Sequence, residues 1–172
     1  AELGKDIVYL HNEGYILAHV KARELGMHVP YRYMHLFEYM RDYLVDHQGE
    51  TTSLNKRVAY QPNCAVRWLP EQDAWLNEIF RLIGVERVSR TYEGINALCC
   101  GGPALFANRE LAMQIQGDNI RDAMDNHADA LITICPMCHT VMRGQTLKAG
   151  LPQIFITDLC RMALGEVSWP SS

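Results

Sequence analysis

Short apolar runs alternate along this chain with longer segments whose apolar residues recur every three or four positions. Such alternation is typical of β-α-β units, in which helices join the strands of a parallel sheet. The short runs predict strands at Asp6–Leu10, Arg57–Tyr60, Ile95–Leu98, Ala130–Ile134 and Gln153–Ile156. The longer segments predict helices at Tyr15–Leu25, His35–His47, Glu71–Ile83, Pro103–Ala128, Met137–Lys148 and Asp158–Leu164. We therefore expect an α/β fold with a largely parallel sheet.

The polar, turn-forming segment 49–56 is the best candidate for an internal boundary. It separates residues 1–48 from a longer region, residues 57–165, which is followed by the short tail 166–172. We expect the longer region to be a complete domain and the first to be a partial one.

A weak internal repeat appears when the chain is aligned with itself at an offset of 124 residues. Segment 6–14 then falls on segment 130–138, and Gly26 falls on Gly150. After that glycine each copy is expected to run through a short strand into a helix, with a slip of one or two residues. Any two strand-helix-strand units look alike, so chance similarity and a true duplication both remain open.

Composition and charge narrow the class of protein. With 172 residues, of which 48% are hydrophobic and 21% charged, the chain can bury a substantial core. The net charge is −4 and the basic residues are scattered, which favours neither nucleic acid nor an anionic membrane as a partner. No apolar run reaches the roughly 18 residues that span a bilayer, and no secretory signal is recognisable. We expect a soluble, cytoplasmic protein without direct membrane insertion.

Five of the six cysteines form one spacing pattern. Cys64 is followed by 34 residues, then by Cys99-Cys100-Gly101-Gly102, then by 34 residues from Gly101 to Ile134, and then by Cys135-Pro136-Met137-Cys138. This clustering is typical of metal ligands in a reducing compartment rather than of a disulfide framework. Cys160 lies apart, on a predicted helix, and is expected to pack in the core.

The three cysteine groups follow the second, third and fourth predicted strands. In a parallel α/β sheet the carboxyl ends of the strands open into one crevice, so these groups should converge there. Pro103 and Pro136 are expected in the first turns of the following helices, a position that tolerates the missing proline N–H. Free backbone N–H groups of those turns would point at the sulfurs and favour the thiolate form.

The number of thiolates limits the kind of site. A structural zinc ion takes four ligands and a cubane iron–sulfur cluster takes four cysteines, so a fifth cysteine needs its own explanation. The adjacent Cys99 and Cys100 are suited to reach two different metal ions. A zinc site with four of the five, a thioredoxin-like redox pair at Cys135 and Cys138, and purely structural cysteines are the alternatives.

The pattern resembles the cysteine-rich CCG domain found in the B- and D-type subunits of heterodisulfide reductase and their relatives, over about residues 57–165. The resemblance implies that Cys64, Cys99, Cys100, Cys135 and Cys138 bind a noncubane 4Fe-4S cluster. The B-type protein has two such copies. By this resemblance residues 1–48 would be the end of a first copy, in which the segment His11-Asn12-Glu13-Gly14 replaces the CxxC and leaves no ligands.

The resemblance further implies an oxidoreductase subunit of anaerobic energy metabolism that reduces a disulfide. Electrons would come from a ferredoxin-like iron–sulfur subunit supplied by a flavin protein, a hydrogenase or a membrane quinone module. His11 and His139 are candidate catalytic proton donors, although a surface or hydrogen-bonded structural role is an alternative for each. The rival function is a structural or electron-wiring module that binds zinc or a cluster without catalysis.

Overall fold

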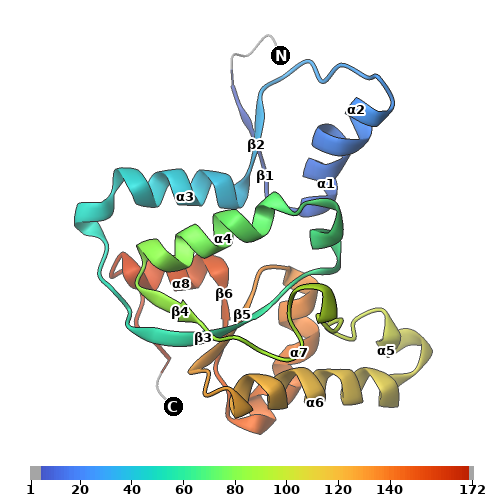
Figure 1. Cartoon of the computed structure of the whole chain (residues 1–172), viewed down its shortest axis with the longest axis vertical. Helices are drawn as coiled ribbons and strands as arrows, with labels where there is room; N and C mark the ends of the chain where they lie inside the picture. Colours follow the sequence, from blue (N-terminus) through green and yellow to red (C-terminus); the bar gives the residue numbers. More distant parts are fainter. Residues whose placement is uncertain (1–4, 171–172) are drawn as a thin grey trace. The chain divides into compact units, whose positions relative to one another are not determined.

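A computed structural model describes residues 5–170 (Figure 1). These residues form two compact units. Among the described residues, unit 1 consists of 5–49 and 65–79, and unit 2 consists of 50–64 and 80–170. Mixed α/β structure with parallel sheets is confirmed in both units. Within residues 5–170, no helix is both long and apolar enough to cross a membrane.

Unit 2 is built on a parallel sheet of four strands in the order β4-β3-β5-β6. The strands are β3 (Lys56–Gln61), β4 (Val85–Arg87), β5 (Ala130–Thr133) and β6 (Gln153–Phe155). All four residues of β5 are buried, as expected for a central strand of a parallel sheet that is covered on both faces. This sheet fixes the loops that carry the cysteines.

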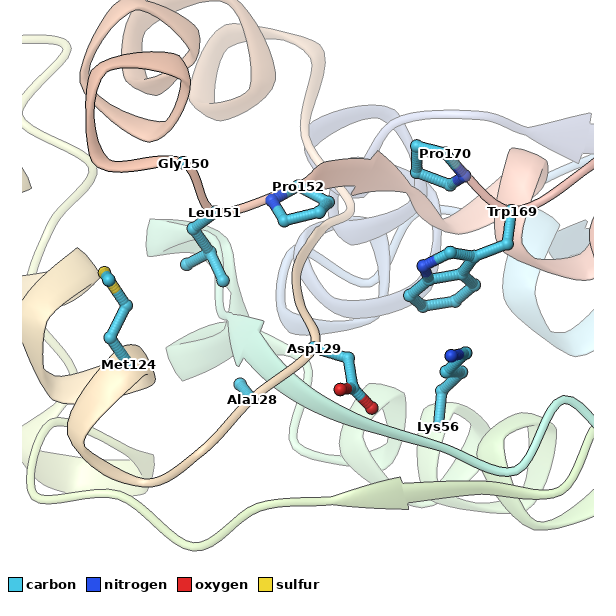
Figure 2. A pocket seen from close by; sticks show the side chains of 9 residues that line it. All are labelled: Lys56, Met124, Ala128, Asp129, Gly150, Leu151, Pro152, Trp169 and Pro170. Atoms are coloured by element: carbon cyan, nitrogen blue, oxygen red, sulfur yellow. The ribbon is translucent and has the colours of Figure 1, made fainter. Parts of the chain in front are cut away.

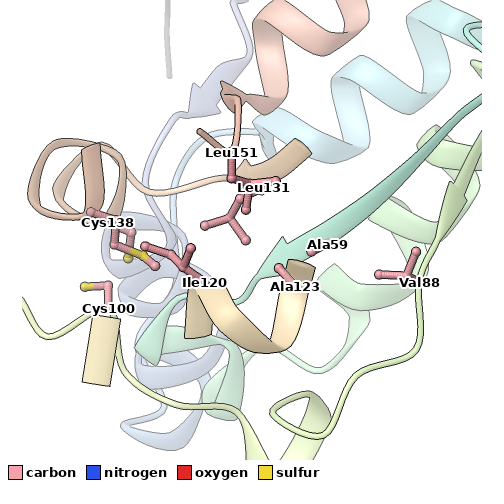
Figure 3. Packing of buried hydrophobic residues seen from close by; sticks show 9 residues of the cluster. Ala59, Val88, Cys100, Ile120, Ala123, Leu131, Cys138 and Leu151 are labelled. Atoms are coloured by element: carbon pink, nitrogen blue, oxygen red, sulfur yellow. The ribbon is translucent and has the colours of Figure 1, made fainter. Parts of the chain in front are cut away.

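One face of this sheet is covered by α6 (Arg109–Asp125) and α7 (Pro136–Ala149). Ala59 and Leu131 pair in register on that face and pack against the apolar sides of both helices (Figure 3). Two of the cysteines, Cys100 and Cys138, belong to the same buried cluster. Burial of each large apolar side chain in this cluster stabilises the folded state by about 1.5–3 kcal/mol. The packing of this core therefore holds the two thiols in place.

The remaining elements of unit 2 are short. They are η4 (Gly94–Asn96), α5 (Ala104–Ala107) and α8 (Ile156–Ala163), together with the end of α4 (Glu71–Leu82) from Phe80 onward. Cys160 on α8 is buried, and burial raises the pKa of its thiol to about 12. The predicted core role of this cysteine is confirmed.

The amino ends of β3, β5 and β6 border a hollow of about 580 Å³. Lys56, Asp129 and Pro152 line it, and the Lys56 ammonium lies 5.2 Å from the centre of the Trp169 ring (Figure 2). The tail around Trp169 is thereby attached to the sheet at the edge opposite to the carboxyl ends of the strands.

Unit 1 holds a two-stranded parallel sheet of β1 (Ile7–Tyr9) and β2 (Tyr33–His35). Between the strands runs one helical segment, in which a π-helical turn interrupts the α-helix. Its parts are α1 (Asn12–Ile16), η1 (Leu17–Lys21) and α2 (Ala22–Glu24), and α3 (Leu36–Asp46) follows β2. Segment 65–79 adds most of η3 (Cys64–Trp68) and the first part of α4 to this unit.

The two β-α-β segments of the predicted repeat end their first helices in the same way. Gly26 and Gly150 have φ angles of 64° and 71°, a left-handed conformation that glycine adopts without strain. In each copy the glycine N–H and the following N–H bond back to carbonyls three and five residues earlier. After the glycine the copies slip by four residues, not the predicted one or two, because β2 begins at Tyr33 and β6 at Gln153.

Two predicted elements are wrong. Residues 95–98 form no strand, because β4 already occupies the edge beside β3 and the Ile95 side chain is 98% exposed. The predicted helix at 103–128 is divided into α5 and α6 by Asn108, whose side chain caps α6 by accepting from the Leu111 N–H at 3.0 Å. The three-residue strand β4 was not predicted, whereas β2 corresponds to the short strand that the repeat predicts after Gly26.

Candidate metal centre

The CxxC segment begins α7 directly beyond the carboxyl end of β5. Cys135 is the N-cap residue, with φ −115° and ψ 128°, and Pro136 occupies the first helical turn as predicted. Cys138 follows within that turn and is buried in the core beside α6. The strand and the helix cap therefore fix both sulfurs of this segment.

Cys99 and Cys100 lie in an irregular loop after η4, rather than at the end of a strand. Cys99 is exposed and Cys100 is buried. The Gly101 N–H donates a hydrogen bond to the Cys99 sulfur, and the Gly102 N–H donates to the Cys100 sulfur. The predicted supply of backbone donors to the thiols is thus present, although a loop provides it instead of a long helix.

Gly101 has a structural reason to be glycine. Its φ is +78°, and a Cβ at this position would lie 2.9 Å from the Ala112 carbonyl oxygen of α6. Both the left-handed backbone and the close approach of α6 exclude a side chain here.

Cys64 is the first residue of η3, three positions beyond the end of β3, and its thiol is exposed. Its sulfur lies close enough to Cys99 to raise the pKa of that thiol electrostatically. All five cysteines of the pattern belong to unit 2.

The five thiols form a series of pairwise interactions, in which three pairs are hydrogen-bonded and Cys64 acts on Cys99 electrostatically. Cys64 interacts with Cys99, Cys99 with Cys100, Cys100 with Cys138, and Cys138 with Cys135. The Cys138 thiol donates to the Cys100 sulfur, and this bond, assisted by the Gly102 N–H, lowers the pKa of Cys100 to about 6. The same bond raises the pKa of Cys138, and burial raises that of Cys99. At neutral pH the group therefore holds a thiolate stabilised by neighbouring thiols.

Among residues 5–170, no three His, Cys, Asp or Glu side chains surround a point suited to one metal ion. The thiols are arranged in succession instead, with Cys99 and Cys100 adjacent in the chain. Five sulfur donors, two of which accept backbone N–H bonds, are suited to a cluster of several irons, because iron–sulfur sites are held by cysteine sulfur and tuned by N–H···S bonds. The residues present fit such a group.

The two candidate histidines have different surroundings. His11, in unit 1, is the exposed N-cap residue of α1, and its Nδ1 lies 3.8 Å from a Glu13 carboxylate oxygen. His139, in unit 2, has its Nδ1 2.8 Å from the Thr133 hydroxyl, and its ring packs edge-on against Phe155. Burial, assisted by the Arg143 guanidinium, lowers the pKa of His139. His139 is therefore hydrogen-bonded, and its role as a proton donor stays a prediction.

Buried amide side chains surround the CCG loop and were not predicted. Gln61, Gln116 and Asn119 are at most 2% exposed and donate to backbone carbonyls of residues 98–100. The sequence held a signal for two of them. Gln116 and Asn119 lie in the buried stripe of α6 between Ala112 and Ala123, where apolar residues are normally expected.

A buried ion pair is bonded to the same part of α6. The Arg90 and Asp122 side chains are 1% and 7% exposed, with 3.8 Å between a guanidinium nitrogen and a carboxylate oxygen. Arg90 donates to the carbonyls of Tyr60 and Asn119, and the Asp122 carboxylate accepts from the N–H groups of Thr91 and Tyr92. These bonds connect the end of β3, α6 and the loop that follows β4.

Residues 58–143, half of the chain, match the family model described as the CCG cysteine-rich domain. The chain belongs to the CCG family. The matched region contains every cysteine of the five-cysteine pattern. The match therefore spans the whole thiol group of unit 2.

Curated relatives of this CCG chain are subunits of a heterodisulfide reductase. The chain is 28% identical over 149 residues to the D-type subunit of the dihydromethanophenazine:CoB–CoM heterodisulfide reductase of Methanosarcina acetivorans, and 28% identical to its counterpart in Methanosarcina mazei. The alignments cover 83% of this chain and 36% of each relative, so the chain spans about a third of their length.

A solved structure of a hypothetical protein from Helicobacter pylori has a similar fold, with a TM-score of 0.58 and 16% sequence identity. The similarity covers 86% of this chain and 29% of that one. At this identity the likeness concerns the fold alone.

Proposed function

We propose that this chain is an iron–sulfur redox subunit, or part of one, that binds a noncubane 4Fe-4S cluster through Cys64, Cys99, Cys100, Cys135 and Cys138. One observation carries the proposal: hydrogen bonds link the sulfurs of Cys99, Cys100, Cys138 and Cys135 in succession, and Cys64 lies near enough to Cys99 to interact with it electrostatically. The CCG match and the relationship to reductase subunits support it.

The chain's own groups have defined roles in this proposal. The N–H groups of Gly101 and Gly102 stabilise negative charge on sulfur, and the core holds Cys100 and Cys138 in place. The exposed Cys64 and Cys99 lie where a substrate can approach from solvent. When bound, such a cluster supplies single electrons and iron positions with affinity for sulfur.

The proposed reaction is the reduction of a disulfide. One disulfide takes up two electrons and two protons, its S–S bond breaks, and two thiols leave. His139, with Nδ1 engaged by Thr133, would move a proton through Nε2, and His11 is the second proposed donor. The low pKa of His139 keeps its ring neutral at pH 7, so it would act as a relay that a solvent proton refills.

The relatives support a role within a multi-subunit redox enzyme. Their name describes one component of a multi-subunit enzyme that acts on the disulfide of coenzymes B and M, with dihydromethanophenazine as the other substrate. For this chain we propose a disulfide as the acceptor and a ferredoxin-like iron–sulfur subunit as the immediate electron donor. A flavin protein, a hydrogenase or a membrane redox subunit would supply that donor.

One observation favours a second function, an electron-wiring or structural module without catalysis. The first β-α-β copy has His11-Asn12-Glu13-Gly14 where the second has its CxxC, so only one of the two copies carries thiols there. A module that has lost one site is expected to keep the other for electron transfer, or for a structural zinc ion.

A turnover experiment separates the two functions. The chain is loaded with iron and sulfide under anaerobic conditions, reduced with a one-electron viologen dye, and mixed with a small disulfide such as cystine. The reductase proposal predicts two thiols for every two dye electrons consumed, and no thiol from a Cys100→Ser variant. A loaded chain that exchanges electrons with the dye but forms no thiol would be a wiring module.

A further inference from the structure

Three consecutive backbone carbonyls of the CCG loop each accept a hydrogen bond from a different buried side-chain amide. Gln61 Nε2 donates to the Leu98 oxygen at 2.9 Å, and Asn119 Nδ2 donates to the Cys99 oxygen at 3.1 Å. Gln116 Nε2 donates to the Cys100 oxygen, also at 3.1 Å. The amides come from β3 and α6, so the loop is held from two elements of unit 2.

The third of these bonds controls the direction of a backbone donor. The carbonyl of Cys100 and the N–H of Gly101 belong to one planar trans peptide, in which the two groups point in opposite directions. Gln116 holds the carbonyl toward α6, and the N–H is thereby turned toward the Cys99 sulfur, to which it donates. The Gln116 amide thus lies on one side of this peptide and the thiol on the other.

The geometry leaves little freedom for the amide group. Gln116 Nε2 lies 3.2 Å from the place where a Cβ of residue 101 would stand, so the side chain packs directly against the glycine. Gln116 is 2% exposed, and the carbonyl that it satisfies would otherwise need another donor. A buried carbonyl without a donor is costly, which makes rotation of the peptide unfavourable as long as Gln116 is present.

We propose that Gln116 is a positioning residue, which aims the Gly101 N–H at the Cys99 sulfur and thereby tunes the metal centre. Gln61 and Asn119 hold the two preceding peptides in the same way. The alignment of this donor is a property of the chain with or without iron, whereas its effect on a redox potential rests on the proposed function. The two parts of the inference are therefore testable separately.

The metal-free chain tests the alignment. Exchange of the Gly101 amide proton is followed residue by residue by NMR in the wild type, in Gln116→Leu and in Gln114→Leu. Gln114 is exposed on the same helix and serves as the matched control. We expect the Gly101 amide proton to exchange at least tenfold faster in Gln116→Leu than in wild type, and at the wild-type rate in Gln114→Leu. The α7 amides should exchange at the wild-type rate in both variants. Unchanged exchange at Gly101 would overturn the proposal.

A second variant keeps the test decisive if Gln116→Leu does not fold. Gln116→Glu preserves the shape, but its ionised carboxylate has no proton to donate to the Cys100 carbonyl. Exchange at Gly101, corrected for its intrinsic pH dependence, should be fast when the glutamate is ionised and slow again when it is protonated. Loss of protection that does not return on protonation would contradict an aiming role.

In the iron-loaded chain the predicted readout is the midpoint potential. Without the aligned N–H, the more negative reduced state loses stabilisation, so Gln116→Leu should be harder to reduce than wild type and Gln114→Leu. A tenfold smaller reduced-to-oxidised ratio corresponds to about 59 mV for a one-electron couple. An unchanged potential at full iron content would overturn the tuning role. A wild-type chain that retains no iron would refute the proposed function, while the exchange experiment still decides the alignment.

Discussion

The Cys138 thiol donates a hydrogen bond to the Cys100 sulfur, and this bond is the main cause of the low pKa of Cys100. Cys138 lies in the first turn of α7, the helix after the central strand, whereas Cys100 lies in an irregular loop. Both side chains are buried in the core of unit 2. The core therefore joins the two cysteine motifs even without a metal.

This bond predicts the behaviour of the metal-free thiols. In wild type Cys100 should lose its proton near pH 6, and Cys138→Ala should move that transition to higher pH because the thiolate loses its donor. The ultraviolet absorbance of thiolate during a pH titration measures the change. Cys160→Ala is the control, because it removes a buried thiol that shifts the pKa of none of these cysteines. It should leave the Cys100 transition at the same pH. An unaltered transition in Cys138→Ala would contradict the assigned contact.

A glycine pair separates backbone strain from steric exclusion in the CCG loop. Gly101 and Gly94 both have positive φ, but only at Gly101 would a Cβ meet α6, 2.9 Å from the Ala112 oxygen. Gly94→Ala should cost about 1 kcal/mol of unfolding free energy, from backbone strain alone. Gly101→Ala should cost about 1–3 kcal/mol more, because α6 or the loop must shift. Denaturant titration measures both, and equal costs would show that α6 does not constrain the loop.

A buried histidine gives unit 1 a predicted pH dependence. His35 is 0% exposed, and its Nδ1 accepts from the Phe37 N–H at 3.2 Å, so the neutral ring carries its proton on Nε2, 3.0 Å from Asn12 Oδ1. Burial lowers the pKa of His35 to about 4. The unfolded chain takes up this proton near pH 6.5 and the folded chain only near pH 4, so stability is complete above pH 6.5 and falls between these values.

The loss should approach about 3 kcal/mol at pH 4, from a pKa difference of about two and a half units. Guanidinium unfolding at several pH values measures it, and Trp75, stacked on His35 at 5.6 Å, offers a local fluorescence signal. In His35→Gln this part of the pH dependence should disappear. A His35→Gln profile parallel to that of wild type would assign the loss to other groups.

The sequence predicted those parts of the structure that repeat a simple pattern. The central strand and the capped helix at Cys135 follow from an apolar run, a cysteine and a proline, and all are confirmed. The strand at 95–98 was wrong because an apolar run does not reveal whether the sheet has a place for it, and Ile95 is exposed instead. Cys64 and the CxxC do follow the ends of β3 and β5. The rule behind the predicted convergence therefore holds for these two cysteine groups.

The amide side chains around the loop were missed for a different reason. The sequence predicts a helix over Gln116 and Asn119, but periodicity identifies its buried stripe and not the backbone groups that lie opposite it. Only the fold places the carbonyls of residues 99 and 100 against these two amides. A polar residue within an apolar stripe was the available signal.

Iron and acid-labile sulfide analysis of anaerobically purified chain tests the central claim most directly. One five-cysteine cluster predicts about four iron and four sulfide per chain. Replacing Cys100 with serine should abolish the cluster absorbance, whereas Cys160→Ser should retain it, because Cys160 lies in the core on α8. One zinc per chain without sulfide, or a full cluster signal in Cys100→Ser, would contradict the account.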